Sequence, residues 1–275
     1  MAENGRRLSV STWSLHRQLG PSWWDSPEEP EKAYSEPWGP GAVTLLELPA
    51  RLAAFGIHTL EICHFHLSQL DDAYLERVRA AHEEAGVSIF SLLIDDGDIS
   101  SPQHQARDLA WIEGWLAVAG VLGADSARVI GGKTLDDGAV ARSRDALASL
   151  ADVAARHNVN LMTENWFDVT GTPDRVCELL EPLRDQVSLC VDFGNWKGAD
   201  KYDDFAQIMP YAGSTHAKCS FTSPLQPDVA DFERCLQVCD EGGFSGPYTL
   251  IYDGPDDDEW AGLQIEADMV RPWLG

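Results

Sequence analysis

The sequence predicts an α/β protein that folds as a single (β/α)8 TIM barrel, and three observations support this fold class. Strand-like and helix-like segments alternate along all 275 residues, as in a parallel sheet wrapped by helices. Eight such pairs can be placed, and none contains an obvious edge strand. The length is close to the roughly 250 residues of one barrel, and no linker divides the chain. We therefore expect one domain over residues 1–275.

Apolar runs and glycine-ended helical segments mark the first four pairs. Gly86 follows a helical segment, where glycine commonly takes the left-handed conformation that ends a helix. Ile112, Leu116 and Ala119 recur at helical spacing, which indicates one buried face. An insertion rich in Pro, Gly and Trp, at about residues 19–41, separates the first strand from its helix. The expected elements are strand 8–14, helix 43–55, strand 59–63, helix 70–84, strand 87–93, helix 103–122, strand 127–130 and helix 136–157.

The second half continues with shorter units of the same kind. Pro173 suits the first turn of a helix, because the N–H group that proline lacks would have no helical partner there. The expected elements are strand 160–163, helix 173–183, strand 187–191, helix 202–209, strand 214–218, helix 229–241, strand 248–252 and helix 258–270. Every strand is thus followed by a helix.

An open, doubly wound sheet is the competing architecture. A dinucleotide-binding version would carry GxGxxG after the first strand, and this sequence has none there. The segment Gly131-Gly132-Lys133-Thr134 resembles the end of a phosphate loop, but the first glycine of that motif would fall at Ala127. We therefore reject a phosphate loop and favour the closed barrel.

Charge and composition restrict the partners that we expect. Forty-five acidic residues against 20 Lys and Arg give a formal net charge of −25, which repels polyanions and makes nucleic acid a poor partner. No segment has the roughly 20 apolar residues of a membrane span, and the N-terminus lacks the apolar run of a secretory signal. Six irregularly spaced cysteines suit a reducing compartment. We expect a cytoplasmic protein without a membrane partner.

Four consecutive strands of the second half end in polar residues that can bind a metal. They are Glu164, Asp192, His216 and Asp253. The carboxyl ends of barrel strands meet at one mouth, and neighbouring strands lie about 4.8 Å apart, so these side chains can converge. Three carboxylates and an imidazole suit one divalent ion: Mn²⁺ first, with Mg²⁺, Co²⁺ and Zn²⁺ left open. Each residue alone would more often be a satisfied strand-end group; four at equivalent positions favour a metal site.

The motifs around these residues resemble the xylose isomerase-like superfamily of sugar isomerases and epimerases, also called the sugar phosphate isomerase/epimerase family. They are SVSTWSL, LEICHFH, RVIGG, TEN, VDFGN, HAK and YDGP, in this order along nearly the whole chain. The resemblance implies a TIM barrel and a metal-dependent sugar isomerase or epimerase. It also implies metal ligands at Glu164, Asp192 and His216.

Three positions depart from the epimerase pattern that the resemblance implies. Asp253 stands where a glutamate ligand is expected, and its side chain is one methylene shorter. Asn195 replaces a histidine three residues after Asp192, and Thr222 replaces an arginine six residues after His216. These departures put ketose 3-epimerase specificity in question more than they do the general chemistry.

Isomerase or epimerase chemistry on a sugar or oxo-sugar would pass through a metal-stabilised enediolate. On the family pattern we expect Glu164 as base and Asp253 as acid or second base, both also metal ligands. Lys218 shares a strand face with His216 and could hydrogen-bond the developing oxyanion or form a structural salt bridge. The side chains that we expect to bind substrate are Trp13, His64, His66, Trp166 and Asn195.

The insertion at residues 19–41 falls on the catalytic face, where Trp23, Trp24 and Trp38 could stack on a sugar or shield the reaction from water. Exposed tryptophan is also typical of interfaces, so the insertion could instead serve a homodimer contact.

Other functions use the same residues. A lyase, either a decarboxylase or a C-glycoside-cleaving enzyme, could use the same enediolate on an oxo-sugar. A catalytically weak sugar-binding subunit is the alternative of another class, and the shorter Asp253 permits it. An apurinic endonuclease is disfavoured, because DNA affinity depends on cationic groups that this chain lacks.

Overall fold

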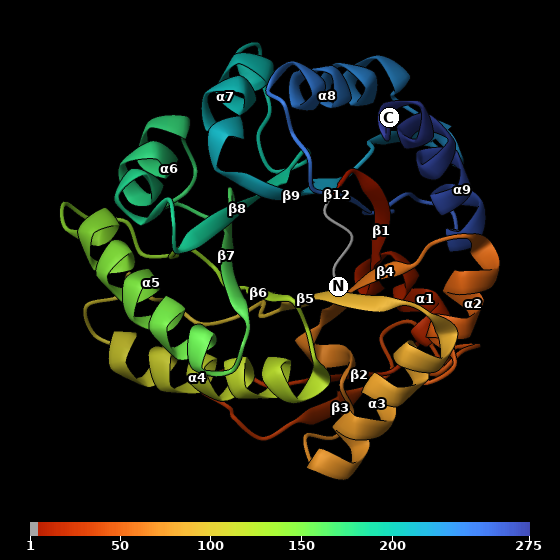
Figure 1. Cartoon of the computed structure of the whole chain (residues 1–275), viewed down its shortest axis with the longest axis horizontal. Coiled ribbons are helices and arrows are strands. Elements are labelled where there is room, and N and C mark those ends of the chain that lie inside the picture. The colour runs from red at the N-terminus through yellow and green to blue at the C-terminus, as the bar shows by residue number, and fades with distance from the viewer. Residues whose placement is uncertain (1–4) are drawn as a thin grey trace.

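Eight parallel strands form a closed barrel in the computed structural model, which describes residues 5–275 (Figure 1). The strand order around the barrel is β1-β12-β9-β8-β7-β6-β5-β4, so strands adjacent in the chain are neighbours and β12 closes onto β1. The strands are β1 Arg7–Ser11, β4 Thr59–Cys63, β5 Ser88–Leu93, β6 Ser126–Arg128, β7 Asn160–Glu164, β8 Val187–Asp192, β9 Ala212–Ala217 and β12 Pro247–Leu250. The predicted fold class is confirmed.

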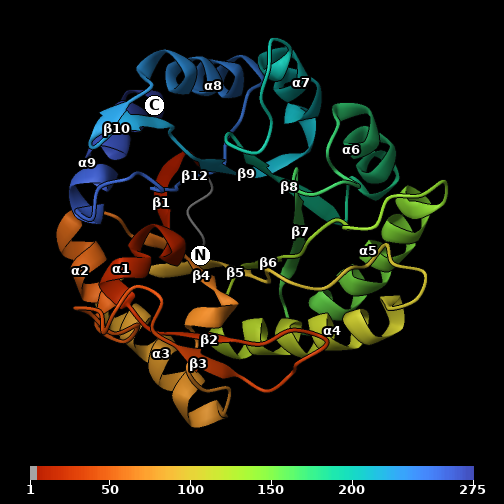
Figure 2. The ribbon, with the colours of Figure 1, turned by 180° about the vertical axis from the view of Figure 1, so that it is seen from behind.

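The helices surround the barrel and cover the outer faces of its strands (Figures 1 and 2). Gly86 ends α3 with a left-handed φ of 64°, as predicted. The helices are α1 His16–Leu19, α2 Leu48–Phe55, α3 Asp72–Ala85, α4 Gln105–Leu122, α5 Ala139–Arg156, α6 Pro173–Leu180, α7 Lys201–Ile208, α8 Val229–Glu241 and α9 Glu259–Val270. The main core lies between strands and helices, where Val10, Leu60 and Leu189 are fully buried. None of these helices is long and apolar enough to cross a membrane.

Two predicted boundaries in the first unit are wrong. The first strand stops at Ser11 instead of residue 14, because the Ser11 hydroxyl accepts a hydrogen bond from the Trp13 N–H and starts a 3-10 turn, Thr12–Leu15. Helix α2 begins at Leu48 instead of residue 43. There the Glu47 carboxylate accepts hydrogen bonds from the backbone N–H and the hydroxyl of Thr44, which stabilises a turn before the helix.

The Pro- and Trp-rich insertion contains a short antiparallel hairpin, which its composition did not predict. Strand β2, Ser22–Trp24, pairs with β3, Ala33–Ser35. A second hairpin, β10 Phe221–Ser223 with β11 Gln226–Pro227, follows β9. In Figure 2 the β2–β3 hairpin lies beside α4, on the face of the barrel opposite to the one seen in Figure 1.

Candidate metal centre and substrate cavity

The carboxyl ends of the strands surround a cavity of about 360 Å³, close to the lower end of the roughly 300–1,000 Å³ typical of ligand pockets. One part of its lining is charged or polar and the other is aromatic. The residues are Ser11, Trp13, Trp24, Cys63, Phe65, Leu93, Asp95, Arg128, Glu164, Trp166, Asp192, Asn195, His216, Lys218 and Ile251. The predicted residues Trp13, Glu164, Trp166, Asp192, Asn195, His216 and Lys218 are therefore brought together.

Glu164 and Asp192 both lie beside His216, an approach that their strand positions predicted. His216 Nδ1 lies 3.4 Å from Asp192 Oδ2 and 3.6 Å from Glu164 Oε2. Parallel pairing places Asp192 beside His216 in the ladder and so explains the approach. All three side chains are buried, and Glu164 Oε2 has no hydrogen-bond partner. Arg128 Nε lies 3.1 Å from this oxygen without donating a hydrogen bond to it, so a bound cation could still satisfy the oxygen.

Glu61 reaches the cluster from β4, on the other side of the barrel, and was given no role from the sequence. Its Oε2 lies 2.9 Å from His216 Nε2, and both groups are buried. With Nε2–H donating to Glu61, the lone pair of Nδ1 faces Asp192 and Glu164. In metal sites, a carboxylate that accepts from one ring N–H of a histidine commonly orients the other ring nitrogen toward the metal, as Glu61 does here for Nδ1.

Negative charge exceeds positive charge inside the cluster. Burial by itself lowers the pKa of His216, but its titratable neighbours Cys190, Glu164 and Glu61 outweigh burial and raise the pKa well above 6.5. Burial likewise opposes ionisation of Glu164, but Arg128 and His216 lower its pKa. Without a metal, Arg128 Nε lies 3.1 Å from Glu164 Oε2, and a proton on His216 supplies the positive charge at Nδ1. A divalent ion on Nδ1 would supply that positive charge instead, so the residues fit a metal.

Among the described residues, Cys190 rather than Asp192 forms the most compact potential ligand group with Glu164 and His216. One ligand atom from each of the three residues lies within 4.8 Å of the others. Burial raises the pKa of the Cys190 thiol to about 11, so this group is a thiol rather than a thiolate at neutral pH. Asp192, which lies on the same face of β8 two residues later, is the more suitable donor for a hard cation.

Asp253 lies outside this cluster, although the sequence predicted it as the fourth ligand. Its carboxylate accepts a hydrogen bond from Lys218 Nζ at 2.8 Å, and its side chain is 41% exposed. Strand β12 ends at Leu250, so Asp253 belongs to the following loop rather than to the strand end. The salt bridge that was one of the two alternatives for Lys218 is thus present, with Asp253 as the partner. Direct metal ligation by Asp253 stays a prediction.

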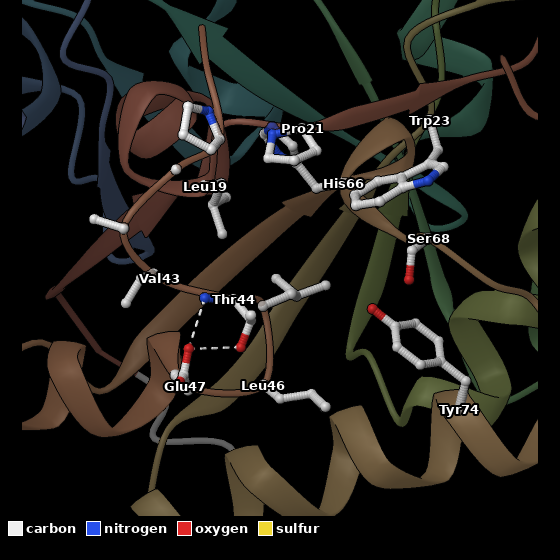
Figure 3. A pocket seen from close by; sticks show the side chains of 14 residues that line it. Leu19, Pro21, Trp23, Val43, Thr44, Leu46, Glu47, His66, Ser68 and Tyr74 are labelled. Carbon is white, nitrogen blue, oxygen red and sulfur yellow. Dashed lines mark hydrogen bonds between the residues drawn. The ribbon is translucent and has the colours of Figure 1, made fainter. Parts of the chain in front are cut away.

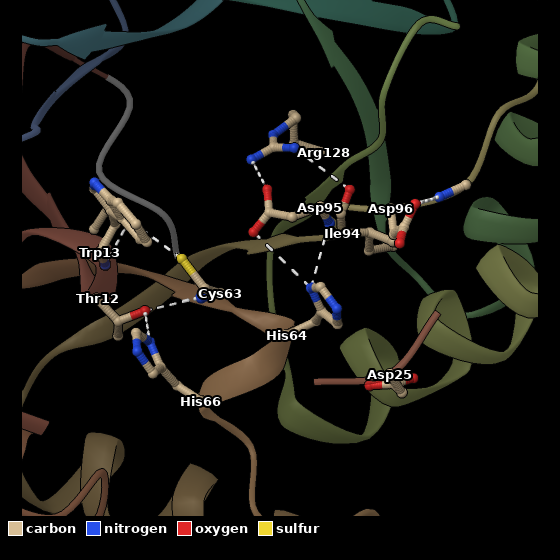
Figure 4. Close-up of polar contacts among 12 residues, drawn as sticks. Thr12, Trp13, Asp25, Cys63, His64, His66, Ile94, Asp95, Asp96 and Arg128 are labelled. Atoms are coloured by element: carbon tan, nitrogen blue, oxygen red, sulfur yellow. Dashed lines mark hydrogen bonds and ion pairs between the residues drawn. The ribbon is translucent and has the colours of Figure 1, made fainter. Parts of the chain in front are cut away.

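His64 and His66 lie behind the cavity wall, whereas the sequence placed them in contact with substrate. The strand stops at Cys63, and residues 64–66 form a 3-10 turn, so Cys63 and Phe65 line the cavity instead. In Figure 4, His66 Nδ1 hydrogen-bonds with Thr12 at 2.8 Å, while Nδ1 of His64 accepts from the Asp95 backbone N–H. Burial lowers the pKa of both imidazoles, that of His66 to about 3. Substrate contact by either histidine stays a prediction that this placement does not favour.

Arg128 is a second cavity residue without a predicted role. Its guanidinium is buried and lies 2.5 Å from Asp95 (Figure 4). It also lies 3.1 Å from Glu164 Oε2 and sits over the ring of Trp166. Asn195 holds the other oxygen of Glu164, since its Nδ2 donates to Oε1 at 2.8 Å. An arginine within an otherwise apolar barrel strand was the signal that could have identified it, because a buried charge is rarely retained without a partner.

Comparison with known proteins agrees with this architecture. A family model described as "Xylose isomerase-like TIM barrel" matches residues 49–272. The chain belongs to this family. The predicted family resemblance is thus confirmed, and the match leaves the insertion at residues 19–41 outside it. No curated protein matches the chain.

Solved structures of the xylose isomerase-like barrel family share the whole fold at low identity. An L-ribulose 3-epimerase superimposes with a TM-score of 0.73 at 16% identity, covering 98% of this chain and 94% of the other. A xylose isomerase-like TIM barrel protein from Mycobacterium smegmatis in complex with magnesium superimposes with a TM-score of 0.69 at 16% identity, covering 97% of this chain and 96% of the other. The 3-keto-D-glucoside 4-epimerase from E. coli superimposes with a TM-score of 0.64 at 17% identity, covering 84% of this chain and 94% of the other.

Proposed function

We propose that this protein is a divalent-metal-dependent isomerase or epimerase of a sugar or oxo-sugar. The observation that carries the proposal is the position of Glu164 Oε2 and Asp192 Oδ2 at 3.6 and 3.4 Å from His216 Nδ1, in a cavity that also has aromatic side chains. Two structural relatives act on sugars by name, and a third holds magnesium. Mn²⁺ suits the two carboxylates and imidazole, and Mg²⁺ is the alternative that the magnesium-bound relative supports.

Glu164, Asp192 and His216 would hold the metal. A divalent cation there would polarise a sugar carbonyl and make the neighbouring C–H more acidic. Asp192 is fixed for this role, because its Oδ1 accepts a hydrogen bond from the Gly194 N–H at 2.6 Å. Glu61 fixes the ring of His216 from the opposite side, at 2.9 Å.

The protein groups around this point can move a proton and hold an oxygen. Glu164 is ionised, since Arg128 and His216 outweigh burial and lower its pKa, so it can accept a proton from carbon. Asn195 and Arg128 restrict its orientation. Lys218 lies in the cavity with its ammonium held by Asp253, and can donate a hydrogen bond to a substrate oxygen that gains charge.

The ion pair of Asp253 with Lys218 also supports a second candidate, a sugar-binding protein with little or no turnover. Isomerisation needs a group that returns the proton, and here the fourth carboxylate is engaged by an ammonium. The two candidates predict the same bound sugar and differ in proton exchange.

Metal analysis and solvent exchange together test the proposal. Purified protein should contain or take up Mn²⁺ or Mg²⁺, and incubation in D₂O with ketoses and 3-keto-glucosides should place deuterium on carbon, detected by proton NMR. His216→Ala and Asp192→Ala should lose the metal while circular dichroism shows an intact fold. Asp253→Asn is the matched control and should lower metal affinity less than Asp192→Asn, because Asp253 lies outside the cluster.

The outcomes separate the candidates. Metal uptake with sugar binding but no exchange on any sugar would favour the binding protein. Unchanged metal content in both His216→Ala and Asp192→Ala would refute the metal centre itself.

A further inference from the structure

The β2–β3 hairpin adds a wall to the cavity from outside the eight barrel strands. Trp24, the last residue of β2, lines the same cavity as Glu164 and His216. The family model matches residues 49–272 and therefore leaves this hairpin out. A side chain that reaches the cavity from an insertion, rather than from a barrel strand end, is a candidate for setting which ligand this protein accepts.

Trp24 continues an aromatic surface that begins on the barrel. Its ring stacks on Phe65 with centroids 3.9 Å apart and an interplanar angle of 15°. Trp13 meets Phe65 edge to face at 6.3 Å. Trp24 is 38% exposed, so a large part of the indole stays available to a ligand. Aromatic rings of this kind bind apolar surface at small entropic cost.

A buried carboxylate fixes the hairpin at the residue after Trp24. Asp25 accepts one hydrogen bond from Trp111 Nε1 of α4 and another from Lys32 Nζ, each at 3.0 Å. The Lys32 ammonium also donates to the Trp23 carbonyl at 3.2 Å and lies 4.6 Å from the centre of the Trp115 ring. Asp25 is only 6% exposed, so these contacts hold the hairpin to α4 in one position.

The neighbouring Trp23 points elsewhere, because successive side chains of a strand face opposite sides. It contacts Tyr34 at 5.7 Å between ring centroids and lines a different cavity, of about 390 Å³, with His66 and Tyr74 (Figure 3). The chain thus offers two adjacent tryptophans of one hairpin, of which only Trp24 is among the residues that line the metal-centre cavity in the described part of the chain.

We propose that Trp24 is a specificity-determining residue that packs against the C–H groups of an uncharged sugar, and that Asp25 is the residue that positions it. Trp24 and Phe65 form the apolar wall of a cavity whose other wall carries Glu164, Asp192 and Lys218. A sugar ring or chain has polar hydroxyls and apolar C–H groups, and it matches both walls. The sugar part of this proposal rests on the proposed function.

A labelling experiment tests the wall without any ligand. Cys63 lines the cavity beside Phe65 and is 2% exposed, whereas Cys177 is partly exposed on α6. We expect Trp24→Ala to react with N-ethylmaleimide at Cys63 several-fold faster than the wild type, measured by peptide mass spectrometry with Cys177 as reference. Trp23→Ala should keep the wild-type rate. Trp24→Phe, which retains an aromatic ring, should restore most of the protection and serves if the alanine variant fails to fold.

A kinetic experiment tests the ligand. With a ketose that the wild type exchanges in D₂O, Trp24→Ala should raise KM about tenfold and change kcat less, because Trp24 is not placed among the groups that move protons. Asp25→Asn should also raise KM. The control Asp136→Asn, which breaks the ion pair of Asp136 with Arg142 in another loop, should leave KM unchanged.

Two results would overturn the role of Trp24 and leave the proposed function intact: equal rates of Cys63 labelling in Trp24→Ala and Trp23→Ala, or equal KM values for Trp24→Ala and the wild type. If the wild-type protein neither binds any of the sugars nor exchanges their carbon-bound protons, the proposed function and the sugar part of this inference are both overturned. The labelling rates would still show whether Trp24 covers the cavity.

Discussion

Glu61 offers the sharpest test of the metal centre, because it contacts His216 and comes from β4, on the other side of the barrel from Glu164 and Asp192. Replacing it by alanine removes the acceptor 2.9 Å from Nε2 in a site where both groups are buried. His216 then loses the partner that directs Nδ1 toward Asp192 and Glu164. Loss of such an outer partner typically weakens metal binding by about 10- to 100-fold, or about 1.4–2.7 kcal/mol.

Titration calorimetry with MnCl₂ measures this change directly. Glu61→Gln keeps an oxygen acceptor without the charge, so its affinity should fall between those of Glu61→Ala and the wild type. Glu266→Gln is the matched control, because Glu266 is also fully buried but belongs to α9 outside the cluster. Nitrogen-15 spectra should show His216 as the Nε2–H tautomer in the metal-bound wild type. Wild-type Mn²⁺ affinity in a folded Glu61→Ala protein would refute the reasoning.

Two further predictions concern stability. Burial raises the pKa of Glu266 well above 4.5 against one hydrogen bond from the Cys219 N–H, so this group stabilises the fold at low pH and loses that contribution as the pH rises toward its folded pKa. As the pH rises above about 4.5, ionisation of Glu266 should therefore lower the unfolding free energy of the wild type by about 1.4 kcal/mol per pH unit. Urea titrations of Glu266→Gln at the same pH values should lack this dependence of the unfolding free energy on pH. Gly262→Ala should destabilise α9 by about 2 kcal/mol in thermal unfolding, since its Cβ would lie 2.2 Å from the ring of Tyr252 and overpacking outweighs the roughly 1 kcal/mol of helix propensity gained. Gly114→Ala in α4, where a Cβ meets nothing within 4 Å, should instead be stabilising, and the opposite order of the two variants would contradict this account.

Much of the barrel could be predicted because its signals are local. Alternating apolar strands and amphipathic helices depend on residues within a few positions of one another, and the predicted strand 59–63 agrees with β4. The errors lie where a single side chain redirects the backbone. The Ser11 hydroxyl ends β1 early, and the hydrogen bonds of Glu47 with Thr44 replace the first turn of a predicted helix.

The candidate site was predicted in part for the same reason. Glu164 and Asp192 end their strands and His216 is the penultimate residue of β9, and parallel pairing alone brings such positions together. Asp253 shows the limit of this argument, because β12 ends three residues before it and Lys218 then captures its carboxylate. Arg128 could have been identified as a charge within a buried strand, but its partners could not.

By itself, the sequence determined the family, the barrel and the three residues that converge at its mouth, because strand order and strand-end position are properties of the chain. Only the tertiary structure decided which groups meet across the barrel. Glu61 contacts His216 although 155 positions separate them, and Trp24 reaches the cavity because Asp25 binds a helix that begins 80 residues later. Such contacts depend on side-chain direction and distance in the folded protein, which no local pattern encodes.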